Sequence, residues 1–213
     1  MKKLPGFISD SERFEILSFV NSLNIKLDIT NEHISKVASE LKGSSYMFDI
    51  TKTKLSNELS TFQSSDNLIN IDLPPIFYSI LNRISNQLQI SKSDVFLQIL
   101  NQQSSGIIHP HYDSAIEGFI TYKCNVAVQS ENYQLNVGDD VLDIKESDLY
   151  CFEASLFKHW TKPFTQKRVI LSYGFILPYK DLCRDENDVR VRLSKRIIKY
   201  FQNSAEDTGN DPV

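Results

Sequence analysis

The sequence lacks the features that mark membrane, secreted and nucleic-acid-binding proteins. No run approaches the ~18 apolar residues that a membrane span needs, and the start, MKKLPGFISDSERF, has two lysines but no apolar signal-peptide core. The formal net charge of −4 provides no basic field to hold nucleic acid or an anionic membrane. These absences predict a soluble protein that binds neither partner.

Cysteine is also scarce. Cys124, Cys151 and Cys183 form no C-x-x-C pair, and any pairing leaves one over. Reduced thiols in the cytoplasm are the simplest interpretation. The chain has 213 residues, of which 41% are hydrophobic and 23% charged, so we expect one domain that rests on a hydrophobic core.

Histidine occurs only four times, and two of the four lie in GIIHPHYD, residues 106–113. Side chains at i and i+2 of an extended segment share a face, so His109, His111 and Asp113 are expected to point the same way. Two histidines and one carboxylate form the facial triad that binds Fe(II) and leaves three positions open. We predict that His111 and Asp113 are two of these ligands and that His159, in another predicted strand, is the third. The H-x-x-x-D pair that starts at His109 is the alternative.

Arg168 follows His159 by nine residues and begins the β-rich run RVILSYGFIL. We predict a hairpin that returns the chain beside His159. An arginine in that place can bind a carboxylate with two parallel hydrogen bonds.

The ordered set of H-x-D, distal histidine and arginine resembles the Fe(II)/2-oxoglutarate-dependent oxygenases over about residues 94–178. The PHYD at 110–113 resembles the P-H-x-D of prolyl-hydroxylase-like members. Residues 148–163, DLYCFEASLFKHWTKP, resemble the D-hydrophobic-Phe…His-x-x-x-Pro segment that contains the distal histidine in this family. The run YKCNVAV followed by LNVGDD is similar to the aspartyl/asparaginyl-hydroxylase-like group, with Lys123 and Asn125 at the two key positions of that group's R-x-H-L strand.

The resemblance implies a double-stranded β-helix, that is, a jelly-roll or cupin-like barrel in an α+β, mainly β protein. It implies Fe(II) held by His111, Asp113 and His159, with 2-oxoglutarate and O₂ as cosubstrates. The expected reaction is hydroxylation of an unactivated C–H bond in an amino acid, a peptide side chain or a small polar metabolite, with release of succinate and CO₂. The alternatives are oxidative cyclisation or desaturation of a natural-product intermediate, and a non-catalytic binding protein on the same barrel.

Alternation along the predicted strands indicates which side chains line the barrel. The run 94–103 places Gln98 and Gln102 opposite its aliphatic face, and the run 119–128 does the same for Thr121, Lys123 and Asn125. In the last strand Ser172 shares a face with Arg168. We expect Arg168 to hold 2-oxoglutarate, with further contacts from Ser172, Lys123, Asn125 and Gln102. A polar pocket with a lysine favours a small-molecule or peptide substrate that carries a carboxylate.

Helical spacing predicts helices over residues 9–24, 30–41, 74–88 and 185–202. We therefore expect one domain over 1–202, made of a helical N-terminal part (1–93) packed outside the barrel, the jelly-roll core (94–178) and a C-terminal helix (185–202) with an acidic start. Residues 203–213 are expected to be disordered. No feature of the sequence determines the oligomeric state.

Overall fold

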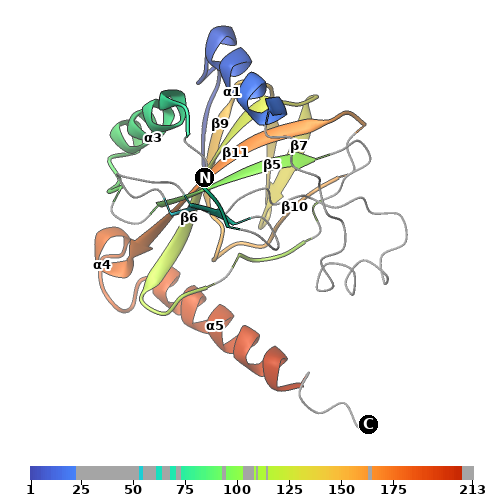
Figure 1. Ribbon diagram of the computed structural model, residues 1–213. Helices are drawn as coiled ribbons and strands as arrows, with labels where there is room; N and C mark the ends of the chain where they lie inside the picture. Colours follow the sequence, from blue (N-terminus) through green and yellow to red (C-terminus); the bar gives the residue numbers. More distant parts are fainter. Residues whose placement is uncertain are drawn as a thin grey trace.

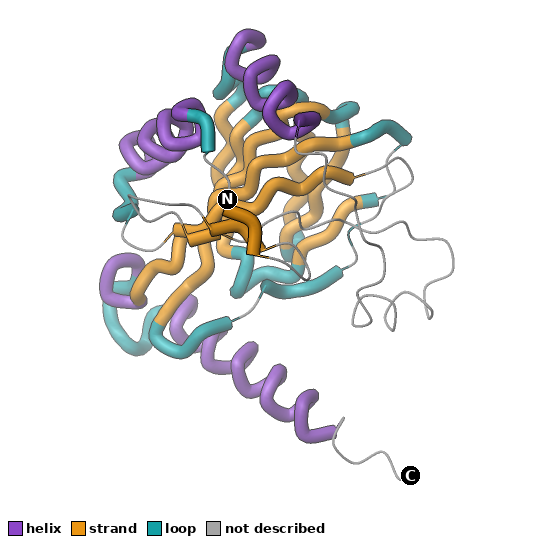
Figure 2. The backbone as a smooth tube through the Cα atoms, in the orientation of Figure 1, coloured by secondary structure: helices purple, strands orange, loops and turns teal. Residues whose placement is uncertain are grey.

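Helices and antiparallel strands share the fold, which is seen here in a computed structural model (Figure 1). The structure describes residues 1–22, 53–54, 61–63, 68–70, 73–92, 95–102, 108, 110–113, 115–162 and 165–207. Figure 2 shows the strands gathered at the centre and the helices around them. Within these ranges, no helix has both the length and the apolar character that crossing a membrane requires.

Six strands form the larger sheet, in the order β1-β9-β6-β11-β5-β2. Their bounds are Lys2–Leu4 for β1, Thr53–Lys54 for β2, Val95–Gln102 for β5, Phe119–Gln129 for β6, Leu149–Glu153 for β9 and Arg168–Pro178 for β11. The central strand, β11, pairs with both β5 and β6. The N-terminal part is therefore not purely helical as predicted, because it adds β1 and β2 to this sheet. Strands of two or three residues are too short to give an alternating signal.

A second sheet has three strands in the order β10-β7-β8: His159–Thr161, Tyr133–Val137 and Asp140–Ile144. The turn of the β7–β8 hairpin contains Gly138 at φ +58°, a conformation that favours glycine. The hairpin predicted between His159 and Arg168 is wrong. β10 pairs with β7 and ends at Thr161, while β11 begins at Arg168 and pairs with β5 and β6, so the two strands lie in different sheets.

Two cores lie on opposite faces of the larger sheet. On one face, α1 (Asp10–Ser22) and α3 (Pro75–Leu88) pack against inward aliphatic residues such as Leu97, Val126 and Leu171. On the other face, Leu100, Ala127 and Ile170 pack against Leu135 and Val137 of the three-stranded sheet. The predicted alternation of β5, β6 and β11 is thus confirmed. Among the described strands no pairing joins the two sheets.

A further hairpin consists of β3 (Thr61–Gln63) and β4 (Leu68–Asn70).

The C-terminal helix, α5, spans Val189–Asp207, so the predicted bounds of 185–202 and the disorder expected from 203 are corrected. Its predicted acidic start lies before the helix. The Asp188 carboxylate accepts a hydrogen bond from the backbone N–H of Arg190 at 2.9 Å. It thereby satisfies one of the backbone donors that have no partner within the first turn of the helix. The short α4 (Tyr179–Leu182) precedes it. The predicted helix at 30–41 and residues 208–213 lie outside the described residues.

Candidate metal centre and adjoining cavity

His111 and His159 lie directly opposite each other because their backbones pair. The His111 N–H donates to the His159 carbonyl at 3.2 Å, and the His159 N–H donates to the His111 carbonyl at 2.9 Å. Further along β10, the Thr161 N–H donates to the Ile108 carbonyl at 3.1 Å. The bridge between His111 and His159 is antiparallel. Side chains opposite each other in such a pair share a face, and the two imidazole centroids are 4.2 Å apart.

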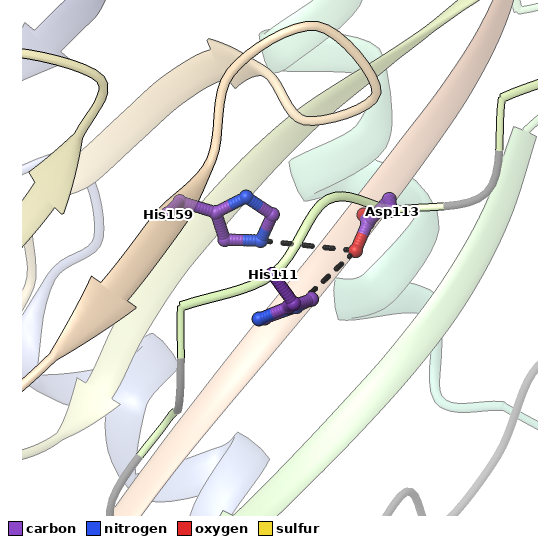
Figure 3. Close-up of side chains that lie close together, drawn as sticks. All are labelled: His111, Asp113 and His159. Carbon is purple, nitrogen blue, oxygen red and sulfur yellow. Dashed lines mark ion pairs between the residues drawn. The ribbon is translucent and has the colours of Figure 1, made fainter. Parts of the chain in front are cut away.

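Asp113 joins the two histidines at the same point. Its backbone N–H donates to the Ala154 carbonyl at 3.0 Å, which fixes the end of the segment against the turn after β9. Its Oδ1 lies 3.5 Å from His111 Nε2 and 3.7 Å from His159 Nε2 (Figure 3). One ligand atom from each residue lies within 4.8 Å of the others. The structure thus brings together the three residues predicted as a metal site.

The tautomer of His159 follows from the hydrogen bond that its Nδ1 atom makes. His159 Nδ1 lies 3.1 Å from the Phe157 carbonyl, which can only accept, so Nδ1 carries the proton and Nε2 presents its lone pair to Asp113 and His111. The ring of Phe152 packs against the imidazole at 4.9 Å. Burial, aided by the charge of His111, lowers the pKa of His159 to about 4, so that the ring is neutral near pH 7. A neutral imidazole held in this way can serve as a metal ligand.

Lys123 binds the other oxygen of Asp113, at 2.9 Å from Nζ to Oδ2. Burial alone would raise the pKa of Asp113, but the Lys123 ammonium, together with a hydrogen bond from His111, holds that pKa well below its usual range. The carboxylate is therefore ionised, with one oxygen facing the histidines and the other paired with a cation. Sequence reasoning placed Lys123 on the inner face correctly but did not foresee this partner.

A cavity of about 140 Å³ opens from these residues into the space between the two sheets. Asp113, Lys123 and His159 line one part of it, and Arg168 and Tyr133 line another. Arg168 is 2% exposed, and its guanidinium carbon lies 4.4 Å from the centroid of the Tyr133 ring. The arginine predicted to meet a carboxylate is thus a buried cation on the wall of the same cavity as the three ligands, although it comes from the other sheet.

Two tyrosines beside Arg168 were not predicted as site residues. The Tyr133 hydroxyl donates to the Tyr150 hydroxyl at 2.8 Å, and both side chains line the cavity. Burial raises the pKa of each, so both hydroxyls stay protonated. The alternation of β7 and β9 could have identified them, because Tyr133 shares a face with Leu135 and Val137 and Tyr150 shares one with Phe152, all in the core between the sheets.

The remaining predicted residues form rows across the larger sheet. Ser172 of β11 lies opposite Gln98 of β5 and Asn125 of β6, which makes a polar row between the two sheets. Within the described part of the chain, Ser172 Oγ and Asn125 Oδ1 are buried and form no hydrogen bond. Such atoms are costly unless a ligand or water meets them. Gln102 pairs with Arg168 through its backbone, but its side chain and His109 lie outside what the structure describes.

No protein-family model and no curated protein sequence matches this chain. Solved structures do. One is a prolyl-4-hydroxylase from Pseudomonas putida, with 11% identity, 83% of this chain and 91% of that chain covered, and a TM-score of 0.46. Another is HygX from Streptomyces hygroscopicus, solved with nickel and 2-oxoglutarate bound, with 9% identity, 83% and 81% covered, and a TM-score of 0.50. At these identities the likeness to HygX concerns the fold, which this chain shares over most of its length.

Proposed function

We propose that this protein is an Fe(II)- and 2-oxoglutarate-dependent dioxygenase. It hydroxylates an unactivated C–H bond of an amino acid, a peptide side chain or a small polar metabolite. The overall conversion consumes R–H, 2-oxoglutarate and O₂ and gives R–OH, succinate and CO₂, which balances in atoms and electrons. The observation that carries the proposal is the convergence of His111, Asp113 and His159 on one point, at the wall of a cavity that also buries Arg168.

The three side chains fit a divalent metal of the first transition row, for which two imidazoles and one carboxylate are suitable donors. Two of them are in their ligand forms near neutral pH: His159 is neutral and presents Nε2, and Asp113 is ionised. A ferrous ion bound there, together with 2-oxoglutarate and O₂, supplies the oxidising power that no protein side chain has. The free thiols of Cys124, Cys151 and Cys183 fit a reducing, cytoplasmic setting, in which iron stays ferrous.

Arg168 is the residue best suited to the far carboxylate of 2-oxoglutarate. Its charge is permanent, it is almost fully buried, and its position over Tyr133 fixes the guanidinium. The Tyr133–Tyr150 pair and the buried Ser172 hydroxyl supply further polar groups on the same side of the sheet. HygX, which has the same fold, holds both a metal and 2-oxoglutarate. The two facing sheets suit the halves of a double-stranded β-helix.

The chain's own residues orient this site and cover part of it. Lys123 turns the Asp113 carboxylate so that Oδ1 faces the histidines. Phe152 covers one side of His159, whose side chain is 5% exposed, whereas the side chain of His111 is 38% exposed. A substrate therefore reaches the centre along the exposed edge of His111.

Succinate production tests the proposal. Purified protein with Fe(II), ascorbate and 2-oxoglutarate should release succinate slowly without a substrate, and faster with an accepted one. Chelation and Asp113→Ala should each abolish the release, and a product heavier by one oxygen would identify hydroxylation. A product lighter by two hydrogens would point to desaturation or cyclisation. If no succinate forms in any of a broad set of amino acids and peptides, the protein is not this enzyme.

A further inference from the structure

A second and larger cavity, of about 510 Å³, lies on the outer side of the metal centre. Its walls are the segment 110–112, the turn that carries Leu156 and Lys158, and one face of α5. His111 lines this cavity as well as the inner one. A molecule in it would therefore contact the exposed edge of the metal centre. We call this cavity the α5 cleft.

The face of α5 that lines the cleft is built from Leu193, Arg196, Ile197 and Tyr200. Their spacing of three, one and three residues places them on one side of a helix. The helix is also docked. Ser194 is fully buried and accepts a hydrogen bond from the Tyr179 hydroxyl at 2.7 Å, and Arg190 pairs with Glu153 at 3.7 Å. The wall of the cleft is thus attached to the larger sheet.

The charged side chains of the α5 cleft are all basic. Lys158 and Arg196 line it, and no acidic residue is among the described residues that do. Lys158 Nζ lies 5.8 Å from the centroid of the Tyr112 ring, and Arg196 forms no ion pair with any residue that the structure describes. In a chain with a net charge of −4, this gives a local positive field beside the metal centre.

The other walls are apolar or aromatic. Leu156 is 3% exposed and Ile197 is 7% exposed, and both contribute to the lining with Tyr112. The volume falls within the ~300–1,000 Å³ typical of sites for small molecules. Lys123, the cation expected from the sequence to contact 2-oxoglutarate or a substrate carboxylate, is already paired with Asp113. Lys158 and Arg196 line the cleft with no acidic residue beside them among the described lining residues.

We propose that the α5 cleft binds the primary substrate, and that this substrate is a small organic carboxylate with an apolar or aromatic body. Its carboxylate pairs with Arg196 and Lys158, and its body lies on Leu156 and Ile197 with one end at His111. That the bound molecule is a substrate rests on the function proposed above. That an amphipathic anion binds rests on the cleft alone.

Binding is measured on the full chain by NMR titration, with 4-phenylbutyrate as the probe and 4-phenylbutyramide and acetate as controls. The acid should bind, whereas the uncharged amide and the short acid should bind at least about fivefold more weakly. Arg196→Gln and Lys158→Gln should each weaken the acid about two- to fivefold, which is the range for exposed charge pairs. Lys195→Gln removes the same charge one residue away on an exposed part of α5, outside the cleft, and should change nothing.

Succinate release from a set of N-acyl amino acids and aryl-alkanoic acids, assayed in the same variants, separates the two proposals. Stimulation that falls in Arg196→Gln but not in Lys195→Gln supports the cleft as the substrate site. Probe binding that is equal in wild type, Arg196→Gln and Lys158→Gln overturns the cleft even if basal succinate release is normal. A third outcome would overturn the substrate assignment: the probe binds in a way that depends on Arg196 and Lys158, and basal succinate release is normal, but no acid stimulates that release. The absence of all succinate release refutes the proposed function, while the binding data still decide whether the cleft takes an anion.

Discussion

The Lys123 ammonium lies 2.9 Å from Oδ2 of Asp113, and the other oxygen of the same carboxylate faces both histidines. The two side chains come from different parts of the chain: Lys123 from the middle of β6, and Asp113 from the segment beside β10. This ion pair orients the carboxylate before any metal arrives. Both side chains are mostly buried, at 13% and 16% exposure, so the pair matters for stability as well as for the site.

Replacing Lys123 with methionine should destabilise the metal-free protein by about 3 kcal/mol, because it leaves a buried carboxylate without its cation. A divalent metal supplies the missing charge. Zn(II) should therefore raise the free energy of unfolding more in Lys123→Met than in wild type, as measured by urea titration with and without the ion. Lys145→Met, at an exposed position, is the control. An equal effect of Zn(II) on both proteins would show that Lys123 and the metal do not share Asp113.

Replacing Arg168 with glutamine should weaken 2-oxoglutarate by about 2 to 5 kcal/mol, at least about thirtyfold in Kd. The reason is that a buried anion would lose the guanidinium that, among the described residues, supplies the permanent positive charge on that wall of the cavity. Calorimetric titration of the Zn(II)-loaded protein measures the change. Zn(II) affinity itself should change little, and Lys167→Gln should behave as wild type. Unaltered 2-oxoglutarate affinity in Arg168→Gln would move the cosubstrate elsewhere.

Acidification should destabilise the metal-free protein through His159. Its pKa is about 4 in the folded state, against 6.5 for an ordinary histidine, so the unfolded chain binds more protons between these values. Stability from this source is complete above about pH 6.5 and is lost as the pH falls toward 4. Between about pH 7.5 and about pH 5.5 the loss is about 1.3 kcal/mol. Urea unfolding at both pH values should show this extra loss in wild type but not in His159→Gln; an identical loss in both would contradict it.

Gly174 should not tolerate even alanine. It lies opposite Phe96 in the β5–β11 pair, and a Cβ at this position would overlap the Phe96 ring. Gly174→Ala should therefore cost about 1 to 3 kcal/mol of unfolding free energy by overpacking. In a Phe96→Ala background the same substitution should cost much less, so the double-mutant cycle isolates the contact. Additive costs would mean that the ring and the glycine do not meet.

The sequence predicted the parts of this site that depend on strand alternation. His111, Asp113 and His159 come together because an extended H-x-D segment and β10 pair in antiparallel register. The inward faces of β5, β6 and β11 follow from the same period of two. Helix α3 was predicted because proline begins it and five apolar residues form one stripe.

Other features depend on which strands pair, and a single sequence carries little information about that. The eight residues between His159 and Arg168 fit a hairpin as well as they fit the passage from one sheet to the other that the chain makes. The Lys123–Asp113 pair and the Tyr133–Tyr150 hydrogen bond each join two different segments whose contact depends on how the strands are arranged. The end of α5 was misplaced because Asn203, Ser204 and Asp207 are weak helix formers, yet the helix includes them together with Ala205 and Glu206.

The central claim is that His111, Asp113 and His159 bind Fe(II) and that the bound ion takes up 2-oxoglutarate. Anaerobic addition of Fe(II) and 2-oxoglutarate to the wild-type protein tests it most directly, through the weak visible absorption band of the chelate. We predict that the band forms only when both are present and that it is absent in Asp113→Ala. No band in the wild type, or a band of equal strength in Asp113→Ala, would contradict the account.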